Sequence, residues 1–304
     1  MDVGVLGTQD GWHLGDLRRA AGTDHRIVSL GFRDLAARLA ANREIVTSSG
    51  VDLAALDCVL VRTMAAGSLE QVVFRMDLLG RLEASGTVVV NSARSVECAV
   101  DKFLASAKLR AADLLVPETI VCQTAESAMA AFTALGGDVV LKPLFGSEGR
   151  GMARLTDEAI AERTFTLLAN LGSVLYLQKF VPHESCDIRA LVIGQRVLGM
   201  RRRNPNDWRT NVRRGASTEA TELDDHLCAT AHAAAAAVGA TVAGVDLLPG
   251  RDGELYVLEV NAVPGWRALA ATLNVDVARL VLDHLRSMKR AKLSEHAKLG
   301  ERGT

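Results

Sequence analysis

The strongest constraint on the fold of this chain is a pair of strand-like segments near its C-terminus that carry polar side chains at fixed positions. Residues 242–248 and 254–265 are rich in apolar and β-branched residues, and the turn formers between them predict a β-hairpin. Because side chains alternate between the faces of a strand, Glu259 and Asn261 share a face, and Asp246 can lie opposite them.

This cluster of oxygen-bearing side chains suits Mg²⁺. The ion commonly takes one or two protein carboxylates and completes its octahedron with water and phosphate oxygens. The alternative is a set of solvated polar residues on an edge strand. The lysine-bearing and arginine-rich segments upstream favour the metal site, so Asp246, Glu259 and Asn261 are its candidate ligands.

The composition predicts a soluble protein. With 304 residues, of which 49% are hydrophobic and 23% charged, the chain can bury a large core in two or three subdomains. A net charge of −1 gives no basic field for nucleic acid. No apolar run approaches the roughly 20 residues that span a bilayer, and the N-terminus is strand-like, so we expect neither membrane partners nor export. The scattered cysteines argue against disulfides or a zinc site and favour a cytoplasmic location.

Residues 1–97 alternate between strand-like and helix-like segments, which predicts a parallel sheet covered on both faces. Arg62 follows a buried-looking strand at its carboxyl end, where open α/β sheets bind ligands, and is a candidate substrate contact. A surface ion pair is the alternative. The predicted elements are 3–6, 14–21, 26–30, 57–61, 69–84 and 87–90.

The middle of the chain contains a candidate phosphate-binding loop. Residues 95–115 have the periodicity of one helix, which carries Lys102. Residues 142–151 then combine Lys142 with closely spaced glycines, whose backbone N–H groups can approach phosphate oxygens. The spacing excludes a P-loop, and a flexible hairpin turn is the alternative. The flanking predicted elements are helices at 127–135 and 157–171 and strands at 138–141 and 174–178.

An arginine-rich segment follows a predicted hairpin at 186–200, in which Asp187 and Arg189 share a face. Residues 201–214 suit anionic substrates, because guanidinium groups bind carboxylates and phosphates bidentately. A solvated basic loop is the alternative. Helices are predicted at 224–238 and 275–288, and the polar tail from about 289 is expected to be disordered or frayed.

Taken together, these motifs resemble the ATP-grasp superfamily, and within it the glutamate ligases typified by the RimK-type enzyme that glutamylates a ribosomal protein. The resemblance implies an α/β (α+β) ATP-grasp fold behind an N-terminal parallel-sheet domain. The implied domains are 1–97, 98–181 with the glycine-rich loop, 182–290 with the metal and substrate site, and a flexible tail at 291–304. The segments that carry it are 101–102, 142–151, 178–180, 186–189, 207–215, 242–246 and 258–265.

The resemblance also implies a role for each candidate residue. Lys102 and Lys142 would contact ATP phosphates, and the glycine-rich loop would close over them. Gln178 would bind ATP, and the backbone of Lys179 and Phe180 would recognise adenine. This branch commonly has glutamate where this chain has Lys179, so a side-chain contact to the nucleotide would be lost there. The further assignments are Gly146, Ser147, Gly149 and Gly151 in the loop; Asp187 near the ribose; Arg189, Arg209 and Asn211 at the reacting groups; and Arg62, Arg203, Arg213 and Arg214 on substrate.

The chemistry implied is that of a carboxylate–amine ligase that uses ATP with Mg²⁺ or Mn²⁺. Transfer of the γ-phosphoryl group to a carboxylate releases ADP and forms an acyl phosphate, which an amine attacks to form an amide and expel phosphate. Glutamate as the amine fits the arginine-rich segment. The acceptor would be a one-carbon cofactor, since residues 61–75 also resemble cofactor glutamate ligases, or a protein terminus. We expect a homo-oligomer. A non-catalytic ATP-binding scaffold with a regulatory role is the alternative, and the full set of metal and arginine residues counts against it.

Overall fold

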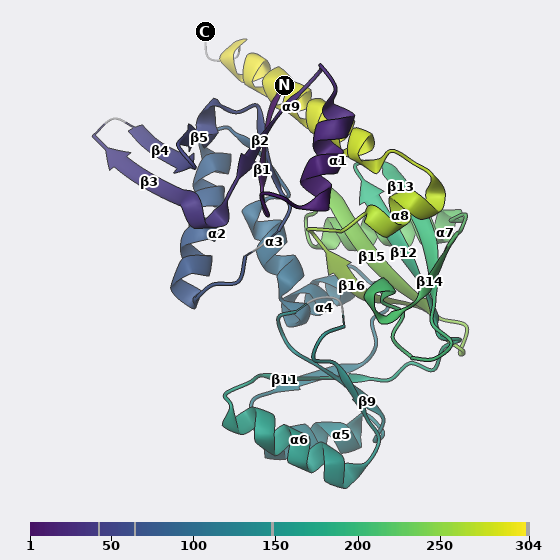
Figure 1. Ribbon diagram of the computed structural model, residues 1–304. Helices are drawn as coiled ribbons and strands as arrows, with labels where there is room; N and C mark the ends of the chain where they lie inside the picture. The colour runs from purple at the N-terminus through teal and green to yellow at the C-terminus, as the bar shows by residue number, and fades with distance from the viewer. Residues whose placement is uncertain (42, 64, 147–148, 302–304) are drawn as a thin grey trace.

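The computed structural model describes residues 1–41, 43–63, 65–146 and 149–301, with backbone alone from residue 295 onward. The described chain is arranged in three parts (Figure 1). The N-terminal strands lie at the upper left and a C-terminal sheet lies at the right. A central subdomain, residues 119–179, lies below them.

The N-terminal sheet is parallel, as the alternating pattern predicts, with the order β2-β1-β6-β7. Both faces are covered by helices, and β6 is buried along its whole length. From β1 the chain crosses to β2 on one side and later reaches β6 on the other, so the strand order reverses at β1. The elements are β1 (Asp2–Leu6), α1 (Trp12–Ala21), β2 (Arg26–Leu30), β6 (Cys58–Val61), α2 (Leu69–Ala84) and β7 (Val88–Val90).

A small antiparallel sheet interrupts this alternation and was not predicted. It consists of β3 (Leu35–Ala40), β4 (Arg43–Ser48) and β5 (Val51–Asp52), flanked by the short helices η1 (Phe32–Asp34) and η2 (Leu53–Ala55). In β3 every residue after Leu35 is exposed, and the composition of alanine, leucine and arginine favours a helix. Pairing with β4 overrides that local preference.

The single helix predicted over residues 95–115 is two helices, so that prediction is wrong. α3 (Ala93–Val100) ends at Asp101, whose extended backbone separates it from α4 (Lys102–Ala111). The Asp101 carboxylate accepts hydrogen bonds from the N–H groups of Phe103 and Leu104, at 2.9 and 3.0 Å, as an N-cap does. The break therefore places Lys102 at the first position of α4.

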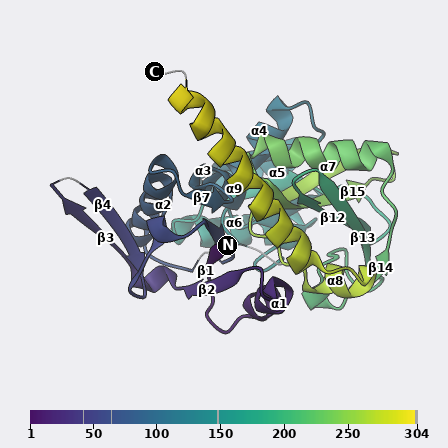
Figure 2. The same ribbon diagram turned by 90° about the horizontal axis from the view of Figure 1, so that it is seen from above.

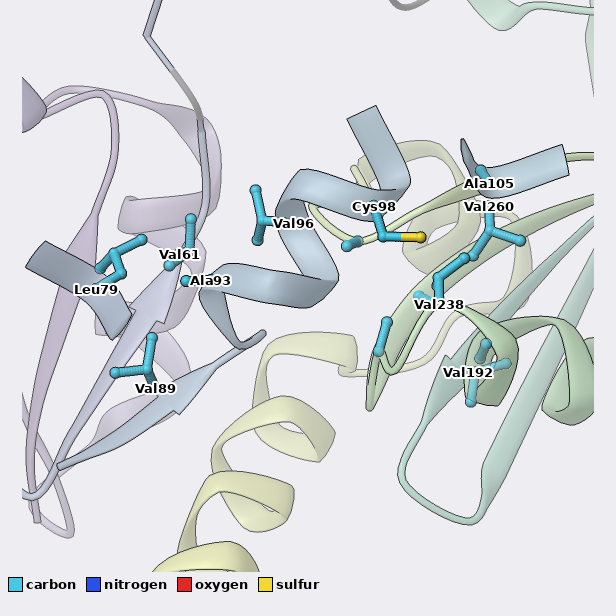
Figure 3. Packing of buried hydrophobic residues seen from close by; sticks show 14 of the residues in the cluster. Val61, Leu79, Val89, Ala93, Val96, Cys98, Ala105, Val192, Val238 and Val260 are labelled. Atoms are coloured by element: carbon cyan, nitrogen blue, oxygen red, sulfur yellow. The ribbon is translucent and has the colours of Figure 1, made fainter. Parts of the chain in front are cut away.

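Helix α3 joins the cores of the N-terminal and C-terminal parts. Ala93 and Val96 face the side chains of the N-terminal sheet and α2, whereas Cys98 faces Val260 of the C-terminal sheet (Figure 3). These residues belong to one continuous cluster of buried side chains. The two sheets are therefore parts of one packed body. Asn91, after β7, strengthens this junction by donating to the carbonyls of Val242 and Ala262, at 2.7 and 2.6 Å.

The central subdomain has a hydrophobic cluster of its own, in which Phe132 and Phe165 pack edge to face at 6.4 Å. Its antiparallel sheet has the order β10-β9-β11-β8 and is covered on one face by two helices (Figure 1). The elements are β8 (Thr119–Cys122), α5 (Ala125–Ala134), β9 (Val139–Lys142), β10 (Ala153–Leu155), α6 (Glu158–Asn170) and β11 (Leu175–Lys179).

The C-terminal sheet is antiparallel, with the order β14-β13-β12-β15-β16. The predicted hairpin of β15 and β16 is present, and Asp246 pairs directly with Glu259 across it. The elements are β12 (Cys186–Ile193), β13 (Arg196–Arg203), η3 (Val212–Arg214), β14 (Ser217–Ala220), α7 (Asp225–Ala237), β15 (Val242–Pro249), β16 (Leu255–Asn261) and α8 (Arg267–Leu273).

The last helix, α9 (Val277–Glu301), is longer than predicted. It packs against α1 and runs across the top of the molecule (Figure 2). The prediction of a disordered or frayed tail from about residue 289 is wrong as far as Glu301, because alanine, lysine, leucine and glutamate favour a helix there. Residues 302–304 of that tail lie outside the described residues. The predicted domain boundaries stay a prediction.

Candidate active site

A cleft of about 990 Å³, including its open mouth, lies between the central sheet and the C-terminal sheet. Its size is that of a small-molecule site. The central subdomain supplies one wall, the C-terminal sheet the other, and α4 closes one end. Most of the residues predicted to bind ATP or metal, or to act at the reacting groups, meet here: Lys102, Lys142, Gly149, Gln178, Lys179, Phe180, Asp187, Arg209, Asn211, Asp246 and Glu259.

A row of alternating charges crosses the wall that the C-terminal sheet provides. Arg189 pairs with Asp246 across β12 and β15, and its Nη1 donates to the Asp246 carboxylate at 2.7 Å. Arg202, on β13, binds Asp187 bidentately at 2.8 and 2.5 Å and reaches Asp246 at 3.0 Å. The short strand-to-strand spacing fixes each partner, so the row is preorganised by the register of the sheet.

The two carboxylates of the hairpin have opposite pKa shifts. Burial alone would raise the pKa of Asp246, but Arg189 and Arg202 outweigh it and hold that pKa below its usual range. Burial, together with the negative charge of Asp246, raises the pKa of Glu259, although Lys102 partly opposes this. Half-buried Glu259 has no arginine partner comparable to those of Asp246 among the described residues. A cation placed beside it would relieve the repulsion between the carboxylates.

The donors at the hairpin fit Mg²⁺. The described residues contain no group of three histidine, cysteine or acidic side chains that could hold a metal ion. The candidate metal ligands are therefore the two carboxylates and the Asn261 amide. Asn261 lies on the Glu259 face of β16, opposite Gly244. Its Oδ1 accepts from the N–H of Val263 at 2.8 Å and retains a second lone pair. Two carboxylates with open space in front of them match the needs of an ion that keeps water and phosphate ligands.

Two lysines line the cleft, Lys142 on the central sheet and Lys102 at the first position of α4. Lys142, at the end of β9, is 9% exposed, and its Nζ donates to Gln178 Oε1 at 2.5 Å. Burial lowers the pKa of Lys142 to about 8, against the opposing effect of Glu259. Lys102 Nζ donates to the Gly146 carbonyl at 2.8 Å, and burial lowers its pKa as well. Both cations lie close enough to Glu259 for its charge to raise their pKa, so the two lysines and the hairpin carboxylates share one cleft.

The glycine-rich loop adopts backbone conformations that other residues rarely take. Gly146, Gly149 and Gly151 have φ angles of 149°, 68° and 70°. A Cβ on Gly149 would lie 2.5 Å from Asn211 Oδ1, and the Gly149 carbonyl accepts from Arg214 Nη2 at 3.2 Å. The loop therefore rests against the arginine-rich segment. Ser147, predicted to bind ATP, lies outside the described residues.

Aromatic side chains line the other end of the cleft. Phe180 packs edge to face with Trp208 at 6.0 Å and lies 5.5 Å from His183, whose Nε2 is 3.0 Å from the Trp208 carbonyl oxygen. Flat apolar surfaces of this kind suit a nucleobase. The N–H groups of Lys179 and Phe180 donate to the carbonyls of Glu118 and Asp138, so adenine recognition by this linker stays a prediction.

The arginines predicted to bind substrate are dispersed. Arg209 faces the cleft, pairs with Asp207 at 2.8 Å and donates to the Met152 carbonyl at 3.3 Å. Arg203 and Arg213 are exposed and are not part of the cleft lining described here. Arg62 lines a different pocket.

Sequence reasoning did not assign Arg202, His183 or Trp208. The signal for Arg202 was the antiparallel hairpin register, which pairs it with Asp187. Without the length of the turn at Gly194, that register could not be fixed. His183 and Trp208 come from loops, where no periodicity indicates which way a side chain points.

The family profile of the RimK-like ATP-grasp domain matches residues 99–285. The chain belongs to this family. It is 32% identical over 265 residues to the tetrahydromethanopterin:α-L-glutamate ligase of Methanosarcina acetivorans, covering 78% of this chain and 82% of that protein. It is 28% identical to the glutamate–LysW ligase ArgX of Sulfurisphaera tokodaii, covering 67% and 75%.

Solved structures show the same fold. The RimK domain ATP-grasp protein of Sphaerobacter thermophilus superposes with a TM-score of 0.70 at 26% identity, over 94% of this chain and 99% of that one. The ATP-grasp ligase PsnB, bound to Mg and ADP, gives a TM-score of 0.74 at 22% identity, over 94% and 97%.

These similarities confirm the ATP-grasp fold and the resemblance to glutamate ligases. They also favour the catalytic interpretation over a non-catalytic scaffold, and the chain is an amide-forming ATP-grasp ligase. Among the described residues, no helix is long and apolar enough to cross a membrane.

Proposed function

We propose that the protein adds L-glutamate, through its amine, to a carboxylate on a one-carbon cofactor of the pterin type. The observation that carries this proposal is the pairing of Asp246 with Glu259 inside a cleft that also holds Lys102 and Lys142. The relative named as a tetrahydromethanopterin ligase supports the cofactor as acceptor. A protein terminus is the second candidate, supported by the relative named as a LysW ligase.

In this proposal the nucleotide lies along the cleft. Its base lies at the end of the cleft that Phe180 and Trp208 line, and its phosphates contact Lys142 and Lys102. Gln178 fixes the Lys142 ammonium group through their 2.5 Å hydrogen bond, so the charge is already positioned when the nucleotide binds. The glycine-rich loop would cover the phosphates and exclude water from the acyl phosphate.

Asp246, Glu259 and Asn261 would hold Mg²⁺, which supplies charge neutralisation at the β- and γ-phosphates. Arg189 and Arg202 hold the Asp246 carboxylate ionised and oriented. Arg209, at the opposite side of the cleft, can bind the anionic oxygens of the acyl phosphate. These residues contribute positioning and charge, which is what phosphoryl transfer requires.

The test combines the purified protein with ATP, Mg²⁺, isotopically labelled L-glutamate and either tetrahydromethanopterin or a small protein with a glutamate C-terminus. We expect ADP release that needs both glutamate and the pterin, and a product heavier by a glutamyl unit in mass spectrometry. ADP release with labelled product only on the protein would favour the second candidate. Absence of labelled product on both acceptors would contradict the proposal.

A further inference from the structure

A second pocket lies at the carboxyl end of the N-terminal parallel sheet, apart from the cleft described above. It is lined by Gly7 and Thr8 after β1, by Gly11 and His13 at the start of α1, and by Arg62 after β6. In open α/β sheets ligands bind outside the carboxyl ends of the strands, at the point where the strand order reverses. This pocket occupies that point, because β1 lies between β2 and β6.

The pocket contains a buried cation that lacks an anionic partner. Arg62 is 7% exposed, and its Nε makes no hydrogen bond. Within the described chain no carboxylate forms an ion pair with it, and its guanidinium stacks on the ring of Trp266 at 4.2 Å. An isolated buried charge is costly, and a cation–π contact offsets only part of that cost. An anion in the pocket would complete the pairing.

The start of α1 adds a second feature that suits an anion. The helix begins at Trp12 after Gly11, and no side chain caps it. Its first N–H groups and the positive end of the helix dipole therefore lie beside Arg62 at the pocket. His13 carries no competing positive charge at neutral pH, because burial and the nearby Arg62 lower its pKa to about 4.

The pocket is linked to the metal-binding hairpin by the chain itself. Strand β16, which carries Glu259, ends at Asn261, and the loop that follows brings Trp266 over Arg62. His13 Nε2 also accepts a hydrogen bond from the backbone N–H of Trp266 at 3.2 Å. A molecule held at Arg62 would therefore lie beside the loop that follows the strand carrying Glu259 and Asn261.

We propose that Arg62 and the N-terminus of α1 bind a carboxylate of one of the two organic substrates, which is either the incoming amino acid or the acceptor. The assignment to a substrate rests on the proposed ligase function. The ability of the pocket to bind a carboxylate does not depend on that function. Carboxylate binding and the substrate role can therefore be tested separately.

The binding test compares wild type with Arg62→Gln and with Arg18→Gln, which removes an exposed arginine from the same subdomain. Each protein is saturated with ADP and Mg²⁺ to occupy the cleft, and acetate and L-glutamate are then titrated separately by calorimetry. We expect wild type and Arg18→Gln to bind at least one carboxylate and Arg62→Gln to lose at least about tenfold in affinity. Equal affinity in Arg62→Gln, or no binding to wild type, would overturn the proposal.

Thermal unfolding without ligand separates this role from a structural one. Arg62→Gln removes an unpaired buried charge, so its midpoint should equal or exceed that of wild type. A lowered midpoint with unchanged carboxylate binding would show that Arg62 serves only to pack against Trp266.

Steady-state ligation then identifies which substrate carries the carboxylate. In Arg62→Gln, a KM raised at least about tenfold for glutamate alone assigns it to the amino acid, and the same rise for the acceptor alone assigns it to the acceptor. Unchanged KM values for both would exclude a substrate role. If wild type ligates no glutamate at all, the proposed function fails, and the calorimetric comparison still decides whether the pocket binds a carboxylate.

Discussion

Asp246 and Glu259 face each other directly across an antiparallel pair of strands, yet among the described residues arginines form ion pairs with Asp246 and not with Glu259. The pair therefore concentrates negative charge at the C-terminal sheet, in the same cleft that Lys102 and Lys142 line. The charge on Glu259 is the part of this arrangement that a bound cation would have to balance.

Glu259→Gln should abolish turnover while keeping the fold. We expect kcat for ADP release to fall at least about 100-fold, because a ligand to the metal is lost. The raised pKa of Glu259 means that the folded state binds its proton more tightly than the unfolded chain, so this carboxylate lowers stability as the pH rises above its ordinary value of 4.5. The metal-free variant should therefore be at least as stable as wild type at pH 7 in thermal unfolding. Glu254→Gln, at an exposed position just before the same strand, is the control, and equal turnover in both variants would refute the metal assignment.

Nucleotide affinity should depend on the protonation of Lys142. Its pKa of about 8 means that its charge is lost above that pH, so the Kd for ADP, measured by calorimetry, should rise between pH 7.5 and 9.5. In Lys142→Arg the charge persists, and the Kd should change much less over the same range. The same slope in both proteins would contradict this role.

The lowered pKa of Lys142 also predicts how stability varies with pH. Between about pH 8 and its ordinary value of 10.5, the unfolded chain binds a proton that the folded chain does not. The contribution of this lysine to the free energy of unfolding should therefore increase with pH across that window. Urea unfolding of wild type and Lys142→Met at several pH values measures it. The difference between the two proteins should change with pH, and a constant difference would count against a buried, easily deprotonated amine.

Gly149→Ala should impair catalysis through contact with Asn211. A Cβ there would lie 2.5 Å from Asn211 Oδ1, so either the loop or the Asn211 side chain must shift, and both belong to the cleft. We expect kcat/KM to fall at least about tenfold. Gly172→Ala is the matched control, because Gly172 has a similar φ of 72° but nothing within 4 Å of its Cβ position. Both variants should lose about 1 kcal/mol of stability, and only the first should lose activity. Equal activity in the two would mean that the loop does not act through this contact.

Arg202→Met should destabilise the protein by about 3 kcal/mol, since it leaves the buried Asp187 carboxylate without its partner. Arg203→Met, at the exposed neighbouring position, should change the free energy of unfolding by less than about 0.5 kcal/mol. Urea denaturation provides both values. Adding Asp187→Leu to Arg202→Met should recover part of the loss, and failure to do so would show that the cost does not come from the unpaired carboxylate.

The sequence predicted the parts of the fold that have a regular period or a clear turn. The β15–β16 hairpin and its facing Asp246 and Glu259 follow from alternation across a strand. Strand β3 could not be predicted, because its residues prefer a helix and only its partner strand holds it extended. Aspartate is a favoured N-cap, so the break between α3 and α4 at Asp101 could have been predicted. It was missed because the helical spacing of apolar residues continues from α3 into α4.

The candidate site was predicted where a motif fixes the position of a side chain, and it was missed for Arg202 on β13 and for His183 and Trp208 in loops. Lys142 and Asp187 are in the cleft as expected. The arginine-rich segment, in contrast, spreads over β13 and a loop, so Arg202 faces Asp187 whereas Arg203 points to solvent. Proximity in sequence did not indicate which arginines would be buried, because the two faces of a strand have opposite environments.

Helix α3 packs against both the N-terminal sheet and the sheet that carries Asp246 and Glu259, so these parts share one hydrophobic core. Residues 119–179 form a separate hydrophobic core. A rigid-body opening of the cleft would therefore move the central subdomain, with Lys142 and Phe180, away from the N-terminal and C-terminal sheets. Nucleotide binding and release would then require movement of the central subdomain alone. The Arg62 pocket lies in the part that does not move, so its geometry would stay the same.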